Sequence, residues 1–283
     1  MFICEICGYS GSVARKRDNK SVKYHNRVAR QYDAMYEDAY WRFHDEVTWR
    51  AIKPYLPADA NARCLDLGCG TGKWGLKLLK SGYRVMFIDH APAMIGEVRG
   101  KLEELGTRTA GSEAAVADIV DMPEVPAAAF ALTLAMGDPL SICSDPARAA
   151  AEMFRCCAPG GVVIATADSK LSAAGAYVER CDFAGLEALL RTGRTRWVTG
   201  DDAEQFELQT FTPGELRRLF ERAGFRVLHV AGKTILPARA GRQFLGQLEG
   251  DAFRRLVQQE MELQKDDLNA ARAAHLQITA KRV

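Results

Sequence analysis

The sequence predicts an α/β fold with a mostly parallel sheet, and three observations support this. From about residue 62 onward, short and nearly continuous apolar runs alternate with segments of helical spacing, as repeated βαβ units require. A glycine-rich turn directly follows the first of these runs. Apolar residues make up 48% of the 283 residues and charged residues 26%, which is sufficient for a packed core.

Charge, hydropathy and cysteine usage exclude several classes of protein. The chain has 38 Lys and Arg against 36 Asp and Glu, and a net charge of +2 excludes a globally basic protein that coats nucleic acid. No apolar run approaches the roughly 18 residues of a membrane span. The N-terminus lacks the features of a signal peptide, so we expect a cytoplasmic protein. In a cytoplasmic protein, the eight cysteines of the chain are expected to be reduced thiols or metal ligands.

Residues 1–23 differ in composition from the rest of the chain. Cys4 and Cys7 form a C-x-x-C pair that resembles half of a zinc site, although zinc needs four ligands and no second pair follows. The basic residues after this pair are Arg15, Lys16, Arg17, Lys20 and Lys23. We expect residues 1–23 to form an N-terminal arm. Its two thiols could bind zinc, carry out redox chemistry or have no ligand, and these three alternatives remain open.

The next segment, residues 24–56, is expected to be helical. Aromatic and apolar side chains recur in it at steps of three or four, which builds one face of a helix. These residues are Tyr32, Tyr36, Tyr40, Phe43 and Val47. Pro54 and Pro57 end the segment, because proline lacks the amide hydrogen that a helix interior needs.

Strands are expected at the short apolar runs, and helices between them. The strands are 63–67, 83–89, 115–118, 130–135, 161–167, 225–230 and 275–280, and the helices are 74–81, 94–105, 146–157, 213–223 and most of 239–270. Thr212, Pro213 and Glu215 are typical of a capping box with proline at the first helical position. Residues 168–210 break the alternation, and we expect them to form a cap inserted over the carboxyl edge of the sheet.

The glycine-rich turn is the most informative segment. Residues 65–72 read Leu-Asp-Leu-Gly-Cys-Gly-Thr-Gly, and alternate glycines let the backbone turn sharply and approach a ligand closely. A phosphate-binding loop is excluded because Lys73 is followed by Trp74 instead of Ser or Thr. A dinucleotide fingerprint fits a frame that starts two residues into the turn, but this frame leaves Asp66 and Gly68 without a role.

A third frame, Asp-x-Gly-x-Gly-x-Gly, uses every position and resembles the nucleoside-binding turn of class I S-adenosylmethionine-dependent methyltransferases. Asp89 ends the second strand, where the family places a carboxylate that accepts both ribose hydroxyls. Asp118 and Ile119 follow the third strand, where an acid and an apolar residue contact adenine. The resemblance covers about residues 24–283. It implies a doubly wound, mostly parallel, Rossmann-like sheet of seven strands with an antiparallel last strand, and a helical lid at residues 24–56.

The resemblance also implies which residues hold S-adenosylmethionine. They are Tyr24, Tyr32, Asp66, Gly68, Cys69, Gly70, Gly72, Asp89, His90, Met94, Asp118, Ile119, Ala135, Met136 and Gly137. Tyr24 and Tyr32 are preferred contacts of the methionyl carboxylate, because a phenol can donate a hydrogen bond while its ring excludes water.

The acceptor end of the site has weaker signals. Residues 138–141 read Asp-Pro-Leu-Ser, where amino-methyltransferases that act on nucleobases have Asp/Asn-Pro-Pro-Tyr/Phe. The missing aromatic residue would stack on a flipped base, so we expect a small-molecule acceptor rather than nucleic acid. The candidate catalytic residues are His44 and Asp138, and further candidate bases are His25, Asp168 and His229.

The sequence therefore predicts methyl transfer from S-adenosylmethionine to a small molecule by in-line displacement, mainly through proximity and desolvation. Three alternatives remain open. They are a methyltransferase acting on RNA or another macromolecule and recruited by the basic arm, an NAD(P)-dependent oxidoreductase, and a non-catalytic S-adenosylmethionine-binding module. We expect a monomer or homodimer without membrane attachment.

Overall fold

A seven-stranded sheet forms the centre of the molecule, which the computed structural model describes over residues 19–197, 204–237 and 242–283. Its strands are β1 (Arg63–Leu67), β2 (Arg84–Asp89), β3 (Glu113–Val116), β4 (Phe130–Ala135), β5 (Cys157–Asp168), β8 (Arg226–Lys233) and β9 (His275–Lys281). They lie in the order β3-β2-β1-β4-β5-β9-β8. The pairs among β1 to β5 are parallel, whereas β9 is antiparallel to both β5 and β8. This confirms the predicted sheet with its antiparallel last strand.

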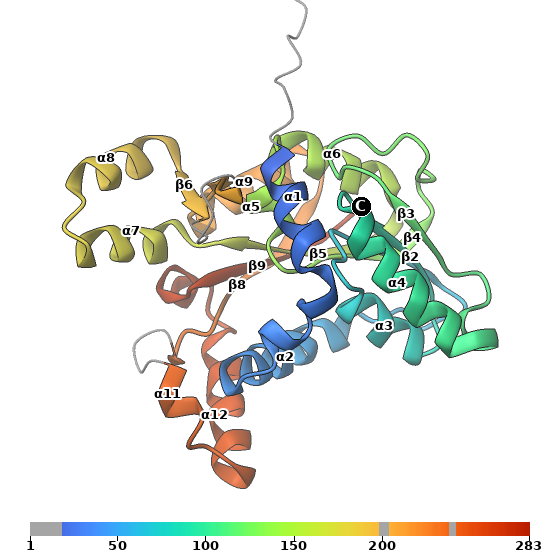
Figure 1. Ribbon diagram of the computed structural model, residues 1–283, viewed down its shortest axis with the longest axis horizontal. Helices are drawn as coiled ribbons and strands as arrows, with labels where there is room; N and C mark the ends of the chain where they lie inside the picture. The colour runs from blue at the N-terminus through green and yellow to red at the C-terminus, as the bar shows by residue number, and fades with distance from the viewer. Residues whose placement is uncertain (1–18, 198–203, 238–241) are drawn as a thin grey trace, which may run out of the picture.

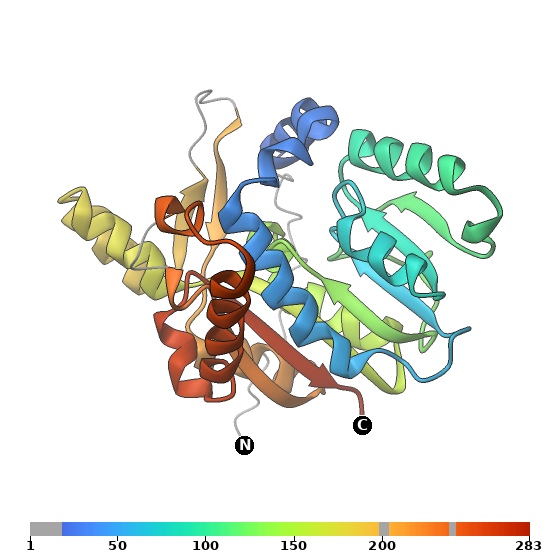
Figure 2. The same cartoon turned by 90° about the horizontal axis from the view of Figure 1, so that it is seen from below.

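Helices cover both faces of this sheet (Figures 1 and 2). They include α3 (Lys73–Lys80), α4 (Pro92–Leu105), α6 (Pro146–Cys156) and α9 (Pro213–Arg222). Leu78 of α3 and Ile95 of α4 are fully buried in one apolar cluster, while Met153 of α6 and Phe220 of α9 are fully buried in another. Burying each such side chain contributes about 1.5–3 kcal/mol, so the sheet is held by a core on either face. This is the doubly wound arrangement.

The predicted elements of the sheet region are present with small shifts at their ends. Strand β3 starts and ends two residues earlier than predicted, so Asp118 lies beyond the strand instead of ending it. Helix α9 begins with the predicted capping box, in which the Thr212 hydroxyl accepts from the amide of Glu215 and the Glu215 carboxylate accepts from the amide of Thr212. Such a cap stabilises a helix by about 1 kcal/mol.

The N-terminal segment is less regular than predicted. It comprises α1 (Asn19–Val28), the 3-10 turns η1 (Ala29–Gln31) and η2 (Ala34–Tyr36), α2 (Ala39–Ile52) and the 3-10 turn η3 (Lys53–Tyr55). A break occurs at Asp38, whose side chain accepts a hydrogen bond from the amide of Trp41 and thereby caps α2. Helix α1 begins at Asn19, ahead of the expected boundary at residue 24. Cys4 and Cys7 lie outside the described residues.

The break divides the predicted aromatic face into two. Phe43 and Val47 are fully buried in a cluster with Leu245 and Val257 of the C-terminal helices. Tyr32 instead packs at the edge of a different cluster, beside the carboxyl ends of the strands. The expectation of a single helical face was therefore wrong, because the helix is interrupted between its two halves.

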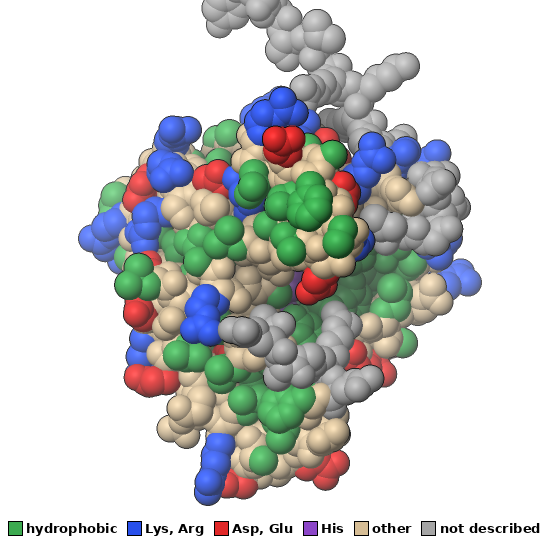
Figure 3. Space-filling view, turned by 90° about the vertical axis from the view of Figure 1, so that its left-hand side faces the viewer, with side chains coloured by type: hydrophobic (Ala, Val, Ile, Leu, Met, Phe, Trp, Pro, Cys, Tyr) green, Lys and Arg blue, Asp and Glu red, His purple; other side chains and the backbone are tan. Residues whose placement is uncertain are grey.

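Residues 168–210 contain two helices and a hairpin. These are α7 (Lys170–Glu179), α8 (Phe183–Thr192), β6 (Arg194–Trp197) and β7 (Phe206–Gln209), with the two strands antiparallel. The α7–α8 pair projects from the body of the molecule (Figure 1). Figure 3 faces that side and shows exposed hydrophobic side chains among charged ones, and Phe183 of α8 is 66% exposed.

The β6–β7 hairpin contacts the N-terminal segment. Arg27 of α1 donates two hydrogen bonds of 2.6 Å to the carboxylate of Glu204, just before β7. The rings of Tyr24 and Phe206 lie 6.0 Å apart. Helix α1 therefore lies between α4 and the hairpin (Figure 2), and both segments reach the carboxyl edge of the sheet.

The C-terminal part completes the fold with α11 (Arg242–Leu245), α12 (Gly250–Leu263) and the 3-10 helix η6 (Asp267–Arg272). The fully buried Glu260 of α12 accepts hydrogen bonds from the amides of Ile235 and Leu236, which fixes the chain after β8. Within the described parts of the chain, no helix is long and apolar enough to cross a membrane.

Candidate active site

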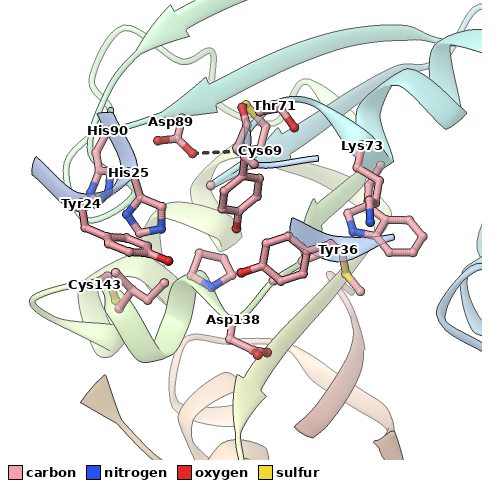
Figure 4. Close-up of a pocket in the computed structure, with 18 of the residues that line it drawn as sticks. Tyr24, His25, Tyr36, Cys69, Thr71, Lys73, Asp89, His90, Asp138 and Cys143 are labelled. Carbon is pink, nitrogen blue, oxygen red and sulfur yellow. Dashed lines mark hydrogen bonds between the residues drawn. The ribbon is translucent and has the colours of Figure 1, made fainter. Parts of the chain in front are cut away.

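A pocket lies at the carboxyl ends of β1, β2, β4 and β5, which is where open α/β sheets bind their ligands. The N-terminal segment and the β6–β7 hairpin cover it. Figure 4 shows Asp89 and Asp138 on opposite sides of this pocket, with Tyr24 and His25 toward one flank and Tyr36 and Lys73 toward the other. The pocket therefore has two polar ends, which differ in how they are built.

The first end is formed by the glycine-rich turn between β1 and α3. Gly68, Gly70 and Gly72 have φ angles of 61°, 54° and 91°, a region that side chains with a Cβ rarely adopt. A Cβ at Gly68 would lie 2.6 Å from the Cβ of Pro139, which begins the short helix α5 (Pro139–Ile142). The sequence folds into this turn because only glycine permits both the conformation and the close approach.

Asp66 supports the turn from inside the protein. It is 1% exposed, and its Oδ2 accepts a 2.7 Å hydrogen bond from the amide of Gly75 in α3. Burial raises the pKa of Asp66 to about 7, which the nearby Asp89 carboxylate reinforces. Asp66 does not line the pocket, so its contribution is to hold the turn against α3.

Asp89 ends β2 and does line the pocket. Its Oδ2 accepts a 2.9 Å hydrogen bond from the amide of Gly70, drawn as a dashed line in Figure 4, and its Oδ1 accepts one of 2.8 Å from the amide of Ala91. A carboxylate oxygen has two lone pairs, so each oxygen retains one acceptor position. The geometry suits a carboxylate that accepts two neighbouring hydroxyl groups.

Asp118 and Ile119 line the same pocket beyond β3. The Oδ1 atom of Asp118 accepts a 3.2 Å hydrogen bond from the amide of Val120, which orients the carboxylate. Ile119 is only 6% exposed and presents an apolar surface next to it. An acid beside an apolar surface can hold a flat ring that carries an amino group.

The fifteen residues predicted to hold the cofactor divide into two groups. Those that line the pocket are Tyr24, Tyr32, Gly68, Cys69, Gly70, Asp89, His90, Asp118, Ile119, Met136 and Gly137. Those that do not are Asp66, Gly72, Met94 and Ala135. Met94 and Ala135 are fully buried in apolar clusters, so they support residues that line the pocket.

Aromatic rings from the N-terminal segment form one wall of the pocket. The ring centroids of Tyr32 and Tyr36 are 4.8 Å apart, and those of Tyr36 and Trp41 are 4.7 Å apart. Burial, together with the adjacent Tyr36, raises the pKa of Tyr32, so its phenol stays protonated and can donate a hydrogen bond. The Cε1 atom of Tyr32 would lie 3.5 Å from a Cβ at Gly70, which places this ring over the turn.

Two ion pairs hold the N-terminal segment against helices α3 and α4. Asp33 accepts from the hydroxyl of Thr71 and, at 2.7 Å, from the ammonium of Lys101. Lys73 at the start of α3 donates a 2.8 Å bond to Asp45 of α2. No motif in the sequence pointed to these contacts, because each joins residues that are distant along the chain.

The second polar end of the pocket gathers three titratable side chains from three strand ends. Asp138 follows β4, Asp168 ends β5 and His275 begins β9. The Nδ1 atom of His275 lies 2.7 Å from Oδ2 of Asp138 and 3.7 Å from Oδ1 of Asp168. Asp138 has a φ of 62°, and its amide donates to the hydroxyl of Thr166 at 2.9 Å. The left-handed backbone of Asp138 turns its side chain toward the other two.

The three groups shift one another's pKa values. Burial, reinforced by the Asp138 carboxylate, raises the pKa of Asp168 to about 7. Burial opposes the ionisation of Asp138, but His275 outweighs it and holds the pKa of Asp138 below its ordinary value. Burial likewise disfavours the imidazolium of His275, yet the adjacent Asp138 carboxylate raises the pKa of His275. The cluster can therefore exchange protons near neutral pH.

His44 is close to this cluster but is engaged elsewhere. Its Nε2 lies 3.0 Å from the ammonium of the buried Lys233, and its Nδ1 lies 3.4 Å from Oδ1 of Asp45. Burial and Lys233 lower the pKa of His44 to about 3. Burial also lowers the pKa of Lys233 to about 8. Both ring nitrogens of a neutral His44 therefore have partners.

The remaining candidate bases lie in different places. His25 and Asp168 line the pocket, whereas the ring of His229 pairs with Asp267 outside it. His275 was not among the predicted residues, because a lone histidine at the start of a strand is usually structural. His275 reaches the site because the antiparallel pairing of β9 with β5 places it opposite Asp168, and no motif in the sequence indicates that pairing.

Comparisons with known proteins agree with this architecture. Residues 64–161 match a family model described as a methyltransferase domain. The fold resembles an S-adenosylmethionine-dependent methyltransferase from Methanosarcina mazei, with a TM-score of 0.59 and 20% identity, covering 82% of this chain and 97% of that one. It also resembles one from Thermotoga maritima described as a possible histamine N-methyltransferase, with a TM-score of 0.57 and 16% identity, covering 93% and 100%.

A third similar structure is an S-adenosylmethionine-dependent methyltransferase from Mesorhizobium loti, with a TM-score of 0.53 and 20% identity, covering 83% of this chain and 98% of that one. No curated protein matches the sequence. The family match includes the glycine-rich turn, Asp89 and Asp118. These findings favour a methyltransferase over the oxidoreductase alternative, because residues 64–161 match a methyltransferase domain and the fold is that of S-adenosylmethionine-dependent methyltransferases.

Proposed function

We propose that the protein transfers the methyl group of S-adenosylmethionine to a small-molecule acceptor within this single pocket. The observation that carries the proposal is the arrangement of the pocket. The glycine-rich turn and Asp89 line one end, the cluster of Asp138, Asp168 and His275 lines the other, and the N-terminal segment covers both. An acceptor at the second end would lie beside the donor, shielded from water.

The residues of the first end fit the methyl donor. The remaining acceptor positions on Asp89 suit the two ribose hydroxyls, and Asp118 with Ile119 suits the adenine ring. The left-handed turn from Gly68 to Gly72 leaves room for the methionyl part beneath Tyr32. Bound there, S-adenosylmethionine supplies a methyl group on a positively charged sulfur. The chain's own contribution is then to align the acceptor and exclude water.

The second end supplies groups that can orient the acceptor and accept its proton. We assign this role to Asp138 and its partners Asp168 and His275, because all three face the pocket. We assign His44 a positioning role, since its two ring nitrogens contact Lys233 and Asp45. His44 thus fixes the wall against which the acceptor lies.

The size of the acceptor is inferred from the cover over the pocket. The Arg27–Glu204 pair and the ring contact of Tyr24 with Phe206 join the N-terminal segment to the β6–β7 hairpin. A pocket covered in this way, in which aromatic walls surround a few polar groups, is typical of small-ligand sites. A macromolecular substrate recruited by the basic arm is the alternative, and its binding would fall steeply with salt.

The experiment offers radiolabelled S-adenosylmethionine and the full-length protein to a size-fractionated cell extract. We expect label in the small-metabolite fraction, and an Asp138→Asn variant should label that fraction about 100-fold more slowly. Label confined to the protein or RNA fractions would refute the small-molecule acceptor. Donor binding without label in any fraction would favour a non-catalytic binding module.

Three further proposals rest on the sequence. We propose that Cys4 and Cys7 bind zinc, that the protein is cytoplasmic, and that it is a monomer or homodimer. Elemental analysis of the full-length protein beside a Cys4→Ser, Cys7→Ser double variant tests the first. Cell fractionation and light scattering test the others.

A further inference from the structure

The cluster of Asp138, Asp168 and His275 has a feature that proton transfer does not require. One donor atom from each of the three side chains lies within 4.8 Å of the other two. The side chains are partly exposed to the pocket, at 14%, 27% and 19% respectively. Three ligand atoms thus converge on one point that opens into the cavity.

The separations suit adjacent positions around a metal ion. Oxygen and nitrogen ligands lie about 2.0–2.2 Å from a divalent transition metal, so neighbouring ligands are about 3 Å apart. The Nδ1 atom of His275 is 2.7 Å from Oδ2 of Asp138 and 3.7 Å from Oδ1 of Asp168. The ligand atoms of the two carboxylates lie within 4.8 Å of each other, and they would move closer together to share one face of an ion. The opposite face would remain open toward the pocket.

A second observation is an acceptor atom that lacks a partner. Oδ1 of Asp138 is buried, and among the described residues it has no hydrogen-bond partner. A buried carboxylate oxygen without a donor is costly, because it loses its hydration without compensation. A cation bound to the cluster would attract both oxygens of this carboxylate.

The charge of the pocket is a third, independent observation. Its described lining residues include six aspartates but a single lysine or arginine, Lys73, which is paired with Asp45. The six are Asp33, Asp45, Asp89, Asp118, Asp138 and Asp168. The buried Lys233 donates its hydrogen bonds to His44 and Thr48, although its charge also acts on Asp138. An acidic cavity of this kind concentrates cations.

We propose that Asp138, Asp168 and His275 bind one divalent first-row transition-metal ion, which holds an oxygen or nitrogen donor of the methyl acceptor on its open face. An imidazole with two carboxylates favours Mn²⁺, Fe²⁺, Co²⁺ or Zn²⁺ over Mg²⁺ and Ca²⁺, which prefer oxygen ligands. The role of the ion rests on the proposed function, and its acceptors would be small molecules with a metal-binding hydroxyl or amine.

Manganese binding to the chelator-treated full-length protein tests the site without any knowledge of the acceptor. Free Mn²⁺ gives a sharp electron paramagnetic resonance signal that is lost on binding, and Mn²⁺ has little affinity for the thiols of Cys4 and Cys7. We expect saturable binding of one ion per chain. Asp168→Asn and His275→Gln should each weaken it at least about 10-fold, the loss that even an outer-shell substitution causes.

The matched control is Asp45→Asn, which removes another carboxylate from the same pocket outside the cluster. It should bind Mn²⁺ as the wild type does. No Mn²⁺ binding by the wild type, or equal binding by the wild type, Asp168→Asn and His275→Gln, would overturn the proposal.

A second readout uses the wild type alone, in case a cluster variant does not fold. The chain has five histidines, and bound Mn²⁺ broadens the ring proton resonances of those nearby. His275 should broaden first and His44, whose ring is 5.8 Å away, next, with His229 little affected. Uniform broadening would contradict the site. Calorimetry with S-adenosylhomocysteine on the metal-free protein separately tests the proposed function, so the two failures are distinguishable.

Discussion

The two ends of the pocket are built in opposite ways. The donor end is a continuous stretch of chain, from Asp66 to Gly72, whose backbone conformation and amides form the site together with Asp89. The proposed acceptor end is assembled from Asp138, Asp168 and His275, which lie at the ends of three strands far apart in the sequence. A site built from consecutive backbone positions can be recognised as a motif in the sequence. A site built from side chains at separate strand ends cannot be recognised until the order of the strands is known. Substitutions at one end should therefore reduce donor binding, whereas substitutions at the other end should slow methyl transfer.

The largest effect is expected at the donor turn. Gly70→Val should abolish binding of S-adenosylhomocysteine, because Gly70 has a φ of 54° and a branched side chain would fill space beneath Tyr32. Calorimetry measures the loss. Gly100→Val is the control, since a Cβ at that position of α4 meets nothing within 4 Å. Wild-type affinity in Gly70→Val would place the donor elsewhere.

The acceptor end should show the reverse behaviour. Asp138→Asn should slow methyl transfer about 100-fold or more, the usual contribution of a positioned acid or base, while leaving S-adenosylhomocysteine affinity unchanged. Single-turnover transfer of radiolabel and calorimetry give the two values. An equal loss of donor affinity would mean that the two ends are not separate.

A smaller effect is expected for the ribose contact. Asp89→Ala should weaken S-adenosylhomocysteine by about 1.5–3 kcal/mol, which corresponds to about 10- to 150-fold in Kd. Part of this loss would come from the amides of Gly70 and Ala91, which lose their acceptor. Asp89→Asn should lose less, because an amide retains one oxygen acceptor. Unchanged affinity in both variants would mean that Asp89 does not contact the donor.

The smallest effect is expected where the N-terminal segment covers the donor. Tyr32→Phe removes a hydroxyl but keeps the ring over Gly70, so donor affinity should fall by about 0.5–1.5 kcal/mol. Tyr32→Ala should cost more, because it also admits water. If Phe and Ala variants lost equal affinity, the ring would have no part in covering the pocket.

Much of the fold could be predicted from the sequence, because buried parallel strands are short apolar runs. β4 has the predicted bounds, Phe130–Ala135, and the capping box at Thr212 is present. The N-terminal segment was mispredicted because its helical periodicity continues across Asp38, whereas the side chain of Asp38 starts a new helix there. Local periodicity does not reveal where one helix ends and another begins.

The candidate site could likewise be predicted only in part. The donor residues follow strands directly, so the motif named most of the residues that line that end of the pocket. Asp66 and Met94 were predicted to bind the cofactor, and both are buried outside the lining of the pocket, since a motif does not distinguish a contact from its support. His275 could not be found without the strand order, because it reaches Asp138 only through the antiparallel pairing of β9 with β5.

A cocrystal structure with S-adenosylhomocysteine tests the central claim, that one pocket holds donor and acceptor at two differently built ends. We expect the ribose hydroxyls on Asp89, the adenine beside Asp118 and Ile119, and the sulfur facing the cavity that ends at Asp138, Asp168 and His275. A ligand bound outside this pocket, or with its sulfur turned away from Asp138, would contradict it.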